Sequence, residues 1–143
     1  ESDTFLPGNE VCVVDTDFGR IGVGICFDIR FPEYFRKLVL SGCEIVFVPS
    51  SFGNATGEAH WVLSMRMRAV DNQCYMLGIQ PAPNPDLPYQ AYGHTVATDP
   101  WGIVLGELNT APGILYAELF ASRIQQVRDE FPLLKARRPE LYV

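Results

Sequence analysis

Apolar residues gather in short runs that polar turns separate. The runs are rich in β-branched residues and nearly continuous rather than alternating, which is typical of strands buried on both faces. We therefore predict four strands, at 11–16, 20–26, 43–50 and 74–80. The pattern over 93–108 predicts a hairpin turned at 99–102, and the run at 113–119 predicts one more strand.

Helical spacing occupies the segments between these strands. Apolar residues recur every three or four positions from Pro32 until Gly42, and again from about Glu58 to Asp71. A strand, a helix and a strand in succession form a parallel crossover unit, so the pattern predicts an α/β fold with helices on one face of the sheet. A polar helix at about 121–130 and a basic tail complete the prediction. The tail is either a solvated end or an arm on a partner subunit.

Composition narrows the function classes. The 143 residues are enough for one domain, and a net charge of −6 argues against nucleic acid as the main partner. No apolar run reaches the length of a membrane span and no basic leader is visible, so we expect neither a membrane anchor nor a secretory signal. The four cysteines show no metal-binding spacing, so we expect free thiols, no metal and a cytoplasmic location, with the mitochondrion as the alternative.

Cys26 differs from Cys12, Cys43 and Cys74 because a turn into a helix follows it directly. Ligands of open α/β sheets sit at the carboxyl ends of strands, where Cys26 is expected to lie. The free N–H groups of the following helix favour a thiolate, and the N–H of Phe27 is placed to stabilise an oxyanion. A buried core cysteine is the alternative for Cys26, and we expect the other three cysteines to be core residues.

The segment around Cys26, GICFDIRFPE at 24–33, resembles the nucleophile segment of the nitrilase superfamily, the carbon–nitrogen hydrolases. The resemblance continues over nearly the whole chain, through VFVPSSF, GEAHWVLSMRMRAVDNQCYML, YGHTVATDPWGIVL and RPELY. These sequence segments are most similar to those of the omega-amidase branch, whose members hydrolyse the terminal amide of small dicarboxylic monoamides.

The resemblance implies a fold and a catalytic apparatus. The fold is half of an αββα sandwich, a mixed sheet with helices on one face and a second layer from a partner subunit. Residues 1–143 match the C-terminal part of the family's domain, so its N-terminal part is absent from this chain. The family's cysteine nucleophile matches Cys26 and its second, supporting glutamate matches Glu1. Its glutamate base and oxyanion lysine lie upstream of Glu1 and match no residue here, so we expect this chain to be inactive alone. No organic cofactor is implied.

Three further residues are candidates for substrate binding. Arg30 either faces a substrate carboxylate or pairs with Glu33 to hold the turn. Phe52 and the NATG loop at 54–57, in which Asn54 is the named candidate, follow a strand end and are expected to line the pocket. The proline-rich loop at 81–92 is expected to form part of it. Members of the omega-amidase branch tend to have asparagine directly after this phenylalanine. Here Gly53 intervenes and Asn54 follows, so the resemblance does not decide the substrate specificity.

Other functions remain as alternatives. His60 or His94 could serve as the base of a papain-type Cys–His hydrolase. The chain could also be an inactive structural half-domain that acts only in subunit assembly, or a nitrilase or carbamoylase of the same superfamily. The expected partners are a small-molecule amide and other copies of the chain, in at least a dimer, with neither nucleic acid nor membrane.

Overall fold

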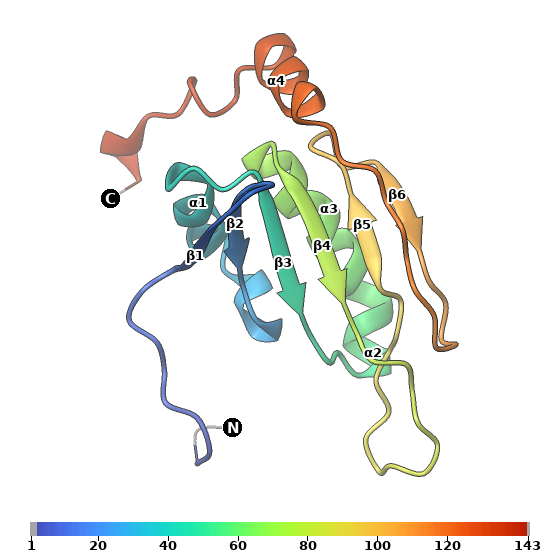
Figure 1. Ribbon diagram of the computed structural model, residues 1–143. Coiled ribbons are helices and arrows are strands. Elements are labelled where there is room, and N and C mark those ends of the chain that lie inside the picture. The colour runs from blue at the N-terminus through green and yellow to red at the C-terminus, as the bar shows by residue number, and fades with distance from the viewer. Residues whose placement is uncertain (1–2, 143) are drawn as a thin grey trace.

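The computed structural model describes residues 3–142, and its centre is one mixed sheet (Figure 1). Six strands lie in the sheet in chain order. Strands β2, β3 and β4 run parallel, while β1 at one edge and β5 and β6 at the other are antiparallel to their neighbours. The strands are β1 (Cys12–Thr16), β2 (Gly19–Val23), β3 (Ile45–Pro49), β4 (Tyr75–Ile79), β5 (Val96–Thr98) and β6 (Val104–Glu107). The predicted α/β class, the four apolar strands and the hairpin are confirmed.

Two helices provide the parallel crossovers, and both lie on the same face of the sheet (Figure 1). Helix α1 (Pro32–Leu40) joins β2 to β3, and α3 (Val62–Asn72) joins β3 to β4. The predicted start of the second helix at Glu58 is wrong in detail. A short helix, α2 (Asn54–Thr56), and a π-helical turn, η2 (Gly57–Trp61), precede α3 there.

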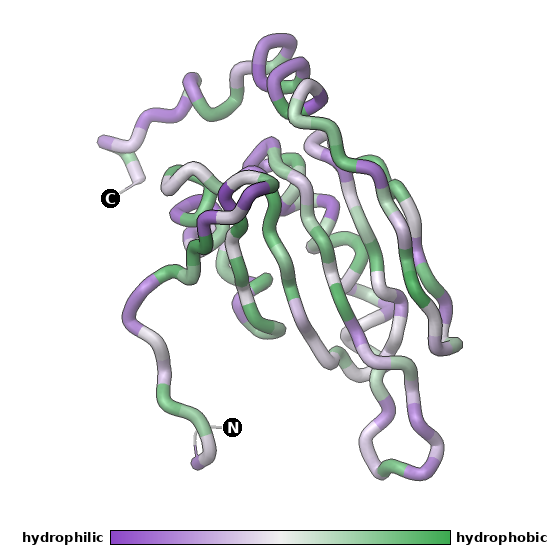
Figure 2. Tube along the Cα trace, viewed as in Figure 1, coloured by the Kyte–Doolittle hydropathy of each residue, from purple (hydrophilic) through white to green (hydrophobic). Residues whose placement is uncertain are grey.

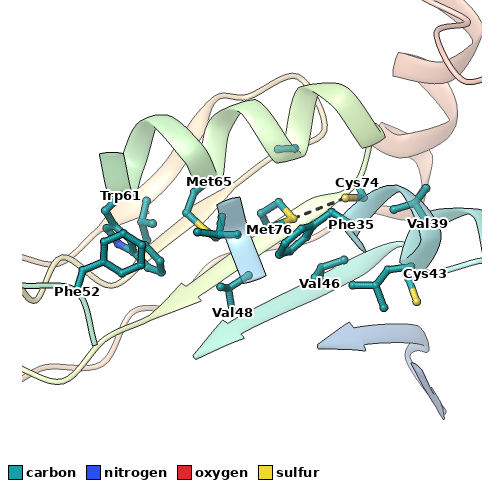
Figure 3. Close-up of a cluster of buried hydrophobic side chains, with 14 residues drawn as sticks. Phe35, Val39, Cys43, Val46, Val48, Phe52, Trp61, Met65, Cys74 and Met76 are labelled. Atoms are coloured by element: carbon teal, nitrogen blue, oxygen red, sulfur yellow. Dashed lines mark hydrogen bonds between the residues drawn. The ribbon is translucent and has the colours of Figure 1, made fainter. Parts of the chain in front are cut away.

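The main core lies between these helices and the sheet, as Figure 3 shows. The ring of Trp61 and the side chain of Met65 pack against Gly78 of β4, where a side chain would leave no room for them. The indole N–H of Trp61 donates to the carbonyl of His94 at 2.7 Å, so its polar atom is satisfied inside the core.

The cysteines divide by environment. All four are free thiols, as expected, and Cys43 and Cys74 belong to the core. Burial raises the pKa of the Cys43 thiol, and it raises the pKa of the Cys74 thiol to about 12. Cys12 is exposed, so its expected core position is wrong. Strand β1 is an edge strand, and only alternate residues, Val11 and Val13, pack on the core.

The predicted strand at 113–119 does not form, and this segment belongs to no helix or strand. It crosses the sheet face opposite the helices, where Leu115, Ala117 and Leu119 line a cavity with Phe47 and Leu77. Alternate side chains therefore face the sheet as they would in a strand, but the backbone pairs with no neighbouring strand.

The chain ends in α4 (Ala121–Glu130) and a short helical turn, η3 (Pro139–Leu141). Figure 2 shows α4 as largely hydrophilic and the tail after it as a mixture of hydrophilic and hydrophobic residues. The arm on a partner subunit and the second layer from a partner subunit stay predictions. Within residues 3–142, no helix combines the length and apolarity needed to cross a bilayer.

Candidate active site

Cys26 lies just beyond a strand end, as predicted, although β2 already ends at Val23. Cys26 is the first residue of a 3₁₀ turn, η1 (Cys26–Arg30), and its φ of +45° is in the left-handed region. Residues other than glycine adopt such a φ only when their surroundings impose it, and single positions of this kind cost roughly 1–3 kcal/mol. The sharp turn holds the thiol at the junction between the strand and the helices, as in a nucleophile elbow.

Hydrogen bonds hold this turn in place. The Ile25 N–H donates to Asp28 Oδ2 at 2.8 Å, and the Asp28 N–H donates back to the Ile25 carbonyl at 2.9 Å. From α3, Arg68 Nε donates to the carbonyl of the fully buried Ile29 at 3.0 Å. Arg68 is itself held by Asp71 Oδ2 at 3.1 Å. These contacts tie the Cys26 turn to the second crossover helix.

The main-chain N–H of Phe27 is free to act as a donor. It makes no hydrogen bond to any residue within 3–142, because the first N–H groups of a helix have no partner inside the helix. The N–H therefore fits the oxyanion role predicted from the sequence, which stays a prediction.

A cavity of about 150 Å³ adjoins the partly exposed Cys26 at the carboxyl ends of the parallel strands. Residues from the turn after β2, from the segment after β3 and from the β4–β5 loop form its walls. The lining residues are Cys26, Phe27, Arg30, Ser51, Phe52, Gly53, Thr56 and Tyr89. The structure thus brings together four of the residues predicted from the sequence, Cys26, Phe27, Arg30 and Phe52.

Arg30 reaches the cavity wall across two aromatic rings. Its guanidinium lies 5.2 Å from the centroid of Phe52 and 5.5 Å from that of Phe27, within the range of cation–π attraction. Its Nη1 lies 3.3 Å from His60 Nδ1, and because arginine can only donate, Nδ1 is the acceptor there. The described residues show no ion pair between Arg30 and Glu33, so the predicted structural pairing is wrong.

Asn54 does not line the cavity, contrary to the prediction. It is exposed at the start of α2, and Thr56, two residues later, faces the cavity instead. Ser51 and Gly53 were missed, whereas Thr56 belongs to the 54–57 loop that was expected to line the pocket. The proline-rich composition of the 81–92 loop did indicate a pocket wall, and Tyr89 bears this out.

Neither histidine lines the Cys26 cavity. His94 Nδ1 pairs with Glu107 Oε1 at 2.6 Å, and its ring stacks on Tyr92 at 4.2 Å. His94 lines a different, larger cavity of about 230 Å³ that contains no cysteine. His60 contacts Arg30 instead. The papain-type arrangement is therefore not formed, and we place the candidate site at the smaller cavity because it contains the thiol.

Two further expectations concern the supporting glutamate, Glu1, and a metal ion. Glu1 lies outside the described residues, so its supporting role stays a prediction. Within residues 3–142, no group of three or more His, Cys, Asp or Glu side chains is arranged to hold a metal ion.

Comparison with known proteins decides the family. The sequence model of the carbon-nitrogen hydrolase family matches residues 1–129 of the chain. The chain belongs to the carbon–nitrogen hydrolase family. The chain is 39% identical over 142 residues to omega-amidase NIT2 of Mus musculus, and 42% identical over 142 residues to omega-amidase NIT3 of Saccharomyces cerevisiae.

These alignments cover 99% of the chain, 51% of the mouse protein and 49% of the yeast protein. The crystal structure of Saccharomyces cerevisiae Nit3, described as a member of branch 10 of the nitrilase superfamily, superposes with a TM-score of 0.91 at 43% identity. That superposition covers 96% of the chain and 51% of Nit3. The carbon–nitrogen hydrolase chain thus has the nitrilase fold and spans about half the length of these relatives.

Proposed function

We propose that this chain carries the nucleophile of an amidase that hydrolyses the terminal amide of a small dicarboxylic acid monoamide. The proposal depends on one observation, a partly exposed Cys26 thiol at a strained helix start, beside a cavity that Arg30 also lines. The omega-amidases to which the chain is similar support the substrate class. Because the chain spans about half of their length, the activity and substrate of the whole protein are part of the proposal.

In the first half-reaction, Cys26 Sγ attacks the amide carbonyl carbon and its proton passes to a general base. The carbonyl oxygen becomes an oxyanion that the Phe27 N–H stabilises. When the C–N bond breaks, the base returns the proton to the leaving nitrogen, so ammonia departs and a thioester stays on Cys26.

In the second half-reaction, water attacks the thioester carbonyl after losing a proton to the same base. The carbon–sulfur bond then breaks, the acid is released and the Cys26 thiol is restored. By the family resemblance, the base and the oxyanion lysine lie upstream of Glu1, and Glu1 supports the site as a second carboxylate. The chain's own contribution is the nucleophile, one oxyanion donor and part of the substrate pocket.

Arg30 provides the means to select a substrate with a second carboxylate. A guanidinium has five N–H donors, and the described contacts use one of them, on His60. Two of the remaining donors can bind a carboxylate side by side. The aromatic rings of Phe27 and Phe52 beside the guanidinium limit the side-chain positions open to it and leave its polar edge for the ligand.

Other family chemistries and assembly are part of the same proposal. A nitrile would add Cys26 to form a thioimidate, which water converts to an acyl thioester with loss of ammonia, and a carbamoyl compound would form a carbamoyl thioester on Cys26 with release of its amine. We propose a homo-oligomer of at least two subunits in the cytoplasm, with the mitochondrion as the alternative, and the four free thiols support a reducing compartment.

The test is ammonia release from succinamate by the complete protein that contains these residues. Cys26→Ala should abolish turnover, while Cys12→Ala, which removes an exposed thiol on the edge strand, should retain it. Rapid quenching followed by trypsin should show the acyl group on the peptide at 21–30, IGVGICFDIR, in which Cys26 is the single cysteine. Full activity of Cys26→Ala would refute the proposal. Turnover of nitriles or carbamoyl compounds in place of succinamate would favour the other chemistries.

A further inference from the structure

The outer wall of the Cys26 cavity comes from the loop that joins β4 to β5. Tyr89 is the residue of this loop that lines the cavity. Its phenol lies over Gly53, since a Cβ added to Gly53 would be 3.4 Å from Tyr89 Oη. The ring and the glycine therefore face each other, and between them they limit the space beside Cys26.

Several main-chain contacts fix the inner end of this loop. The Tyr89 hydroxyl donates to the Ser51 carbonyl at 2.7 Å, and the Tyr92 N–H donates to the Phe52 carbonyl at 2.7 Å. Gly53 and Ala91 form an isolated antiparallel bridge between the same two segments. Tyr89 is therefore held against the segment that carries Phe52, although the residue is 55% exposed.

The tip of the loop is bonded differently. Asn84 accepts from the N–H of Asp86 through its side chain, and its carbonyl accepts from the N–H of Leu87 and the amide of Gln90. These bonds fold the tip on itself, and the tip adds no residue to the cavity lining. Tyr89 thus stands at the boundary between a self-contained tip and the fixed pocket wall.

We infer that the Tyr89 ring sets the length of the acyl group that Cys26 accepts, and that Gly53 provides the space for that group. The inference rests on the proposed function and names its selectivity. The cavity beside Cys26 is small, about 150 Å³, and the Tyr89 ring borders it. Short monoamides such as succinamate are therefore preferred, and the ring occupies the space that a homologue with a longer chain, such as adipamate, requires.

The first test compares kcat/KM for adipamate and succinamate in the complete protein. Tyr89→Ala should raise the adipamate-to-succinamate ratio about tenfold or more, the effect expected when room for additional methylene groups opens in a pocket. Tyr89→Phe removes the hydrogen bond to Ser51 but keeps the ring, so the ratio should stay within about twofold.

Two more variants complete the design. Gly53→Ala should lower the ratio, because the new methyl group narrows the space from the other side. Its φ of −77° and ψ of 160° suit alanine. Leu87→Ala at the exposed loop tip is the matched control and should change neither rate. An unchanged ratio in a folded Tyr89→Ala protein overturns the inference, and if that variant does not fold, an unchanged ratio in Gly53→Ala does so.

A second readout does not depend on turnover. Iodoacetamide and a bulky maleimide would be compared for their rates of Cys26 alkylation, measured on the tryptic peptide at 21–30. Tyr89→Ala should raise the rate of Cys26 alkylation by the bulky maleimide several-fold more than the rate with iodoacetamide. An equal increase in both rates overturns the inference. Failure of the proposed function would appear separately, as absence of hydrolysis of either amide by the unsubstituted protein.

Discussion

Two individual residues, Cys26 and Arg30, are central to the proposed chemistry. Cys26 has a left-handed backbone and borders a cavity, whereas Cys43 and Cys74 are buried with a raised thiol pKa and stay protonated. Arg30 lines the same cavity and makes no ion pair with the carboxylates of residues 3–142. In the proposed function, Cys26 is the nucleophile and Arg30 is an unneutralised cation that binds a substrate carboxylate.

Removal of that cation should affect charged substrates selectively. Arg30→Gln should lower kcat/KM for succinamate by about 10- to 100-fold, since a hydrogen bond to a charged group contributes about 1.5–3 kcal/mol. Hydrolysis of a neutral amide of similar size, butyramide, should change little. The measurement is steady-state ammonia release from both substrates by the complete protein, and an equal loss on the two would contradict a carboxylate-binding role for Arg30.

Cys74 should make stability depend on pH in the alkaline range. Its thiol pKa is about 12 in the folded chain, against about 8.5 in an unfolded one. Because the folded pKa is raised, the stabilising contribution is complete below about pH 8.5 and is lost as pH rises towards 12, by up to about 1.4 kcal/mol per pH unit.

Urea unfolding between pH 8 and pH 10.5 measures this dependence. Cys74→Ala should be less stable overall but should have a flatter decline with pH, while Cys12→Ala should keep the slope of the unsubstituted protein. Identical slopes in all three proteins would show that the buried thiol is not the titrating group.

The sequence located the residues that sit within its motifs, and missed those whose position depends on loop geometry. Cys26, Phe27 and Arg30 occupy one short turn, and Phe52 follows the next parallel strand, so the strand ends bring them together. Whether Asn54 or Thr56 faces the cavity depends on the short helix α2, which has no periodic pattern. Tyr89 comes from a loop whose path follows from its contacts with residues 51–53.

At the scale of elements, close packing between α3 and β4 fixes the relation of the helices to the sheet. Gly78 is the next-to-last residue of β4 and faces Trp61 of η2 and Met65 of α3. The register that pairs Gly78 with Val48 and Val96 therefore depends on a position without a side chain.

Gly78→Ala should destabilise the protein by roughly 1–3 kcal/mol, the usual cost of overpacking a core. A Cβ there would lie 2.5 Å from Trp61 Cζ2 and 2.9 Å from Met65 Cε. Gly8→Ala is the control, because a Cβ at Gly8 would meet no atom within 4 Å. Urea unfolding of both variants provides the comparison, and equal stability of Gly78→Ala and the unsubstituted protein would contradict this account of the packing.

Element prediction succeeded where one pattern has one structural meaning. Continuous apolar runs with an intervening helix require a parallel sheet, and β2, β3, β4 and α1 followed directly. The apolar run at 113–119 was ambiguous, because an extended segment lying across a sheet can carry the same run as a strand but needs no backbone partner. Leu115 and its neighbours show the first arrangement.

At the scale of the whole molecule, the sheet is covered by helices on one face and by little more than the 113–119 segment on the other. Since Gly78 faces α3, Leu77 and Ile79 face the opposite side, where Ile79 is 42% exposed. Apolar surface of this kind favours association.

We expect residues 1–143 produced alone to form dimers or larger species at micromolar concentration, to bind an apolar dye, and to leave succinamate unhydrolysed. Light scattering, dye fluorescence and ammonia assays check the three points, with the complete protein as the control. A monodisperse monomer that binds no dye would contradict the expected association, and Cys26-dependent turnover would show that the base and lysine are not required from upstream residues.

The buried bond between Phe52 and Gln80 has one more consequence. The Phe52 N–H donates at 2.7 Å to Oε1 of Gln80, which is 7% exposed. The main-chain amide hydrogen of Phe52 can therefore exchange with deuterium only when the segment after β3 separates from the end of β4. The exchange rate of this single hydrogen would report how often the wall of the cavity beside Cys26 opens by local unfolding.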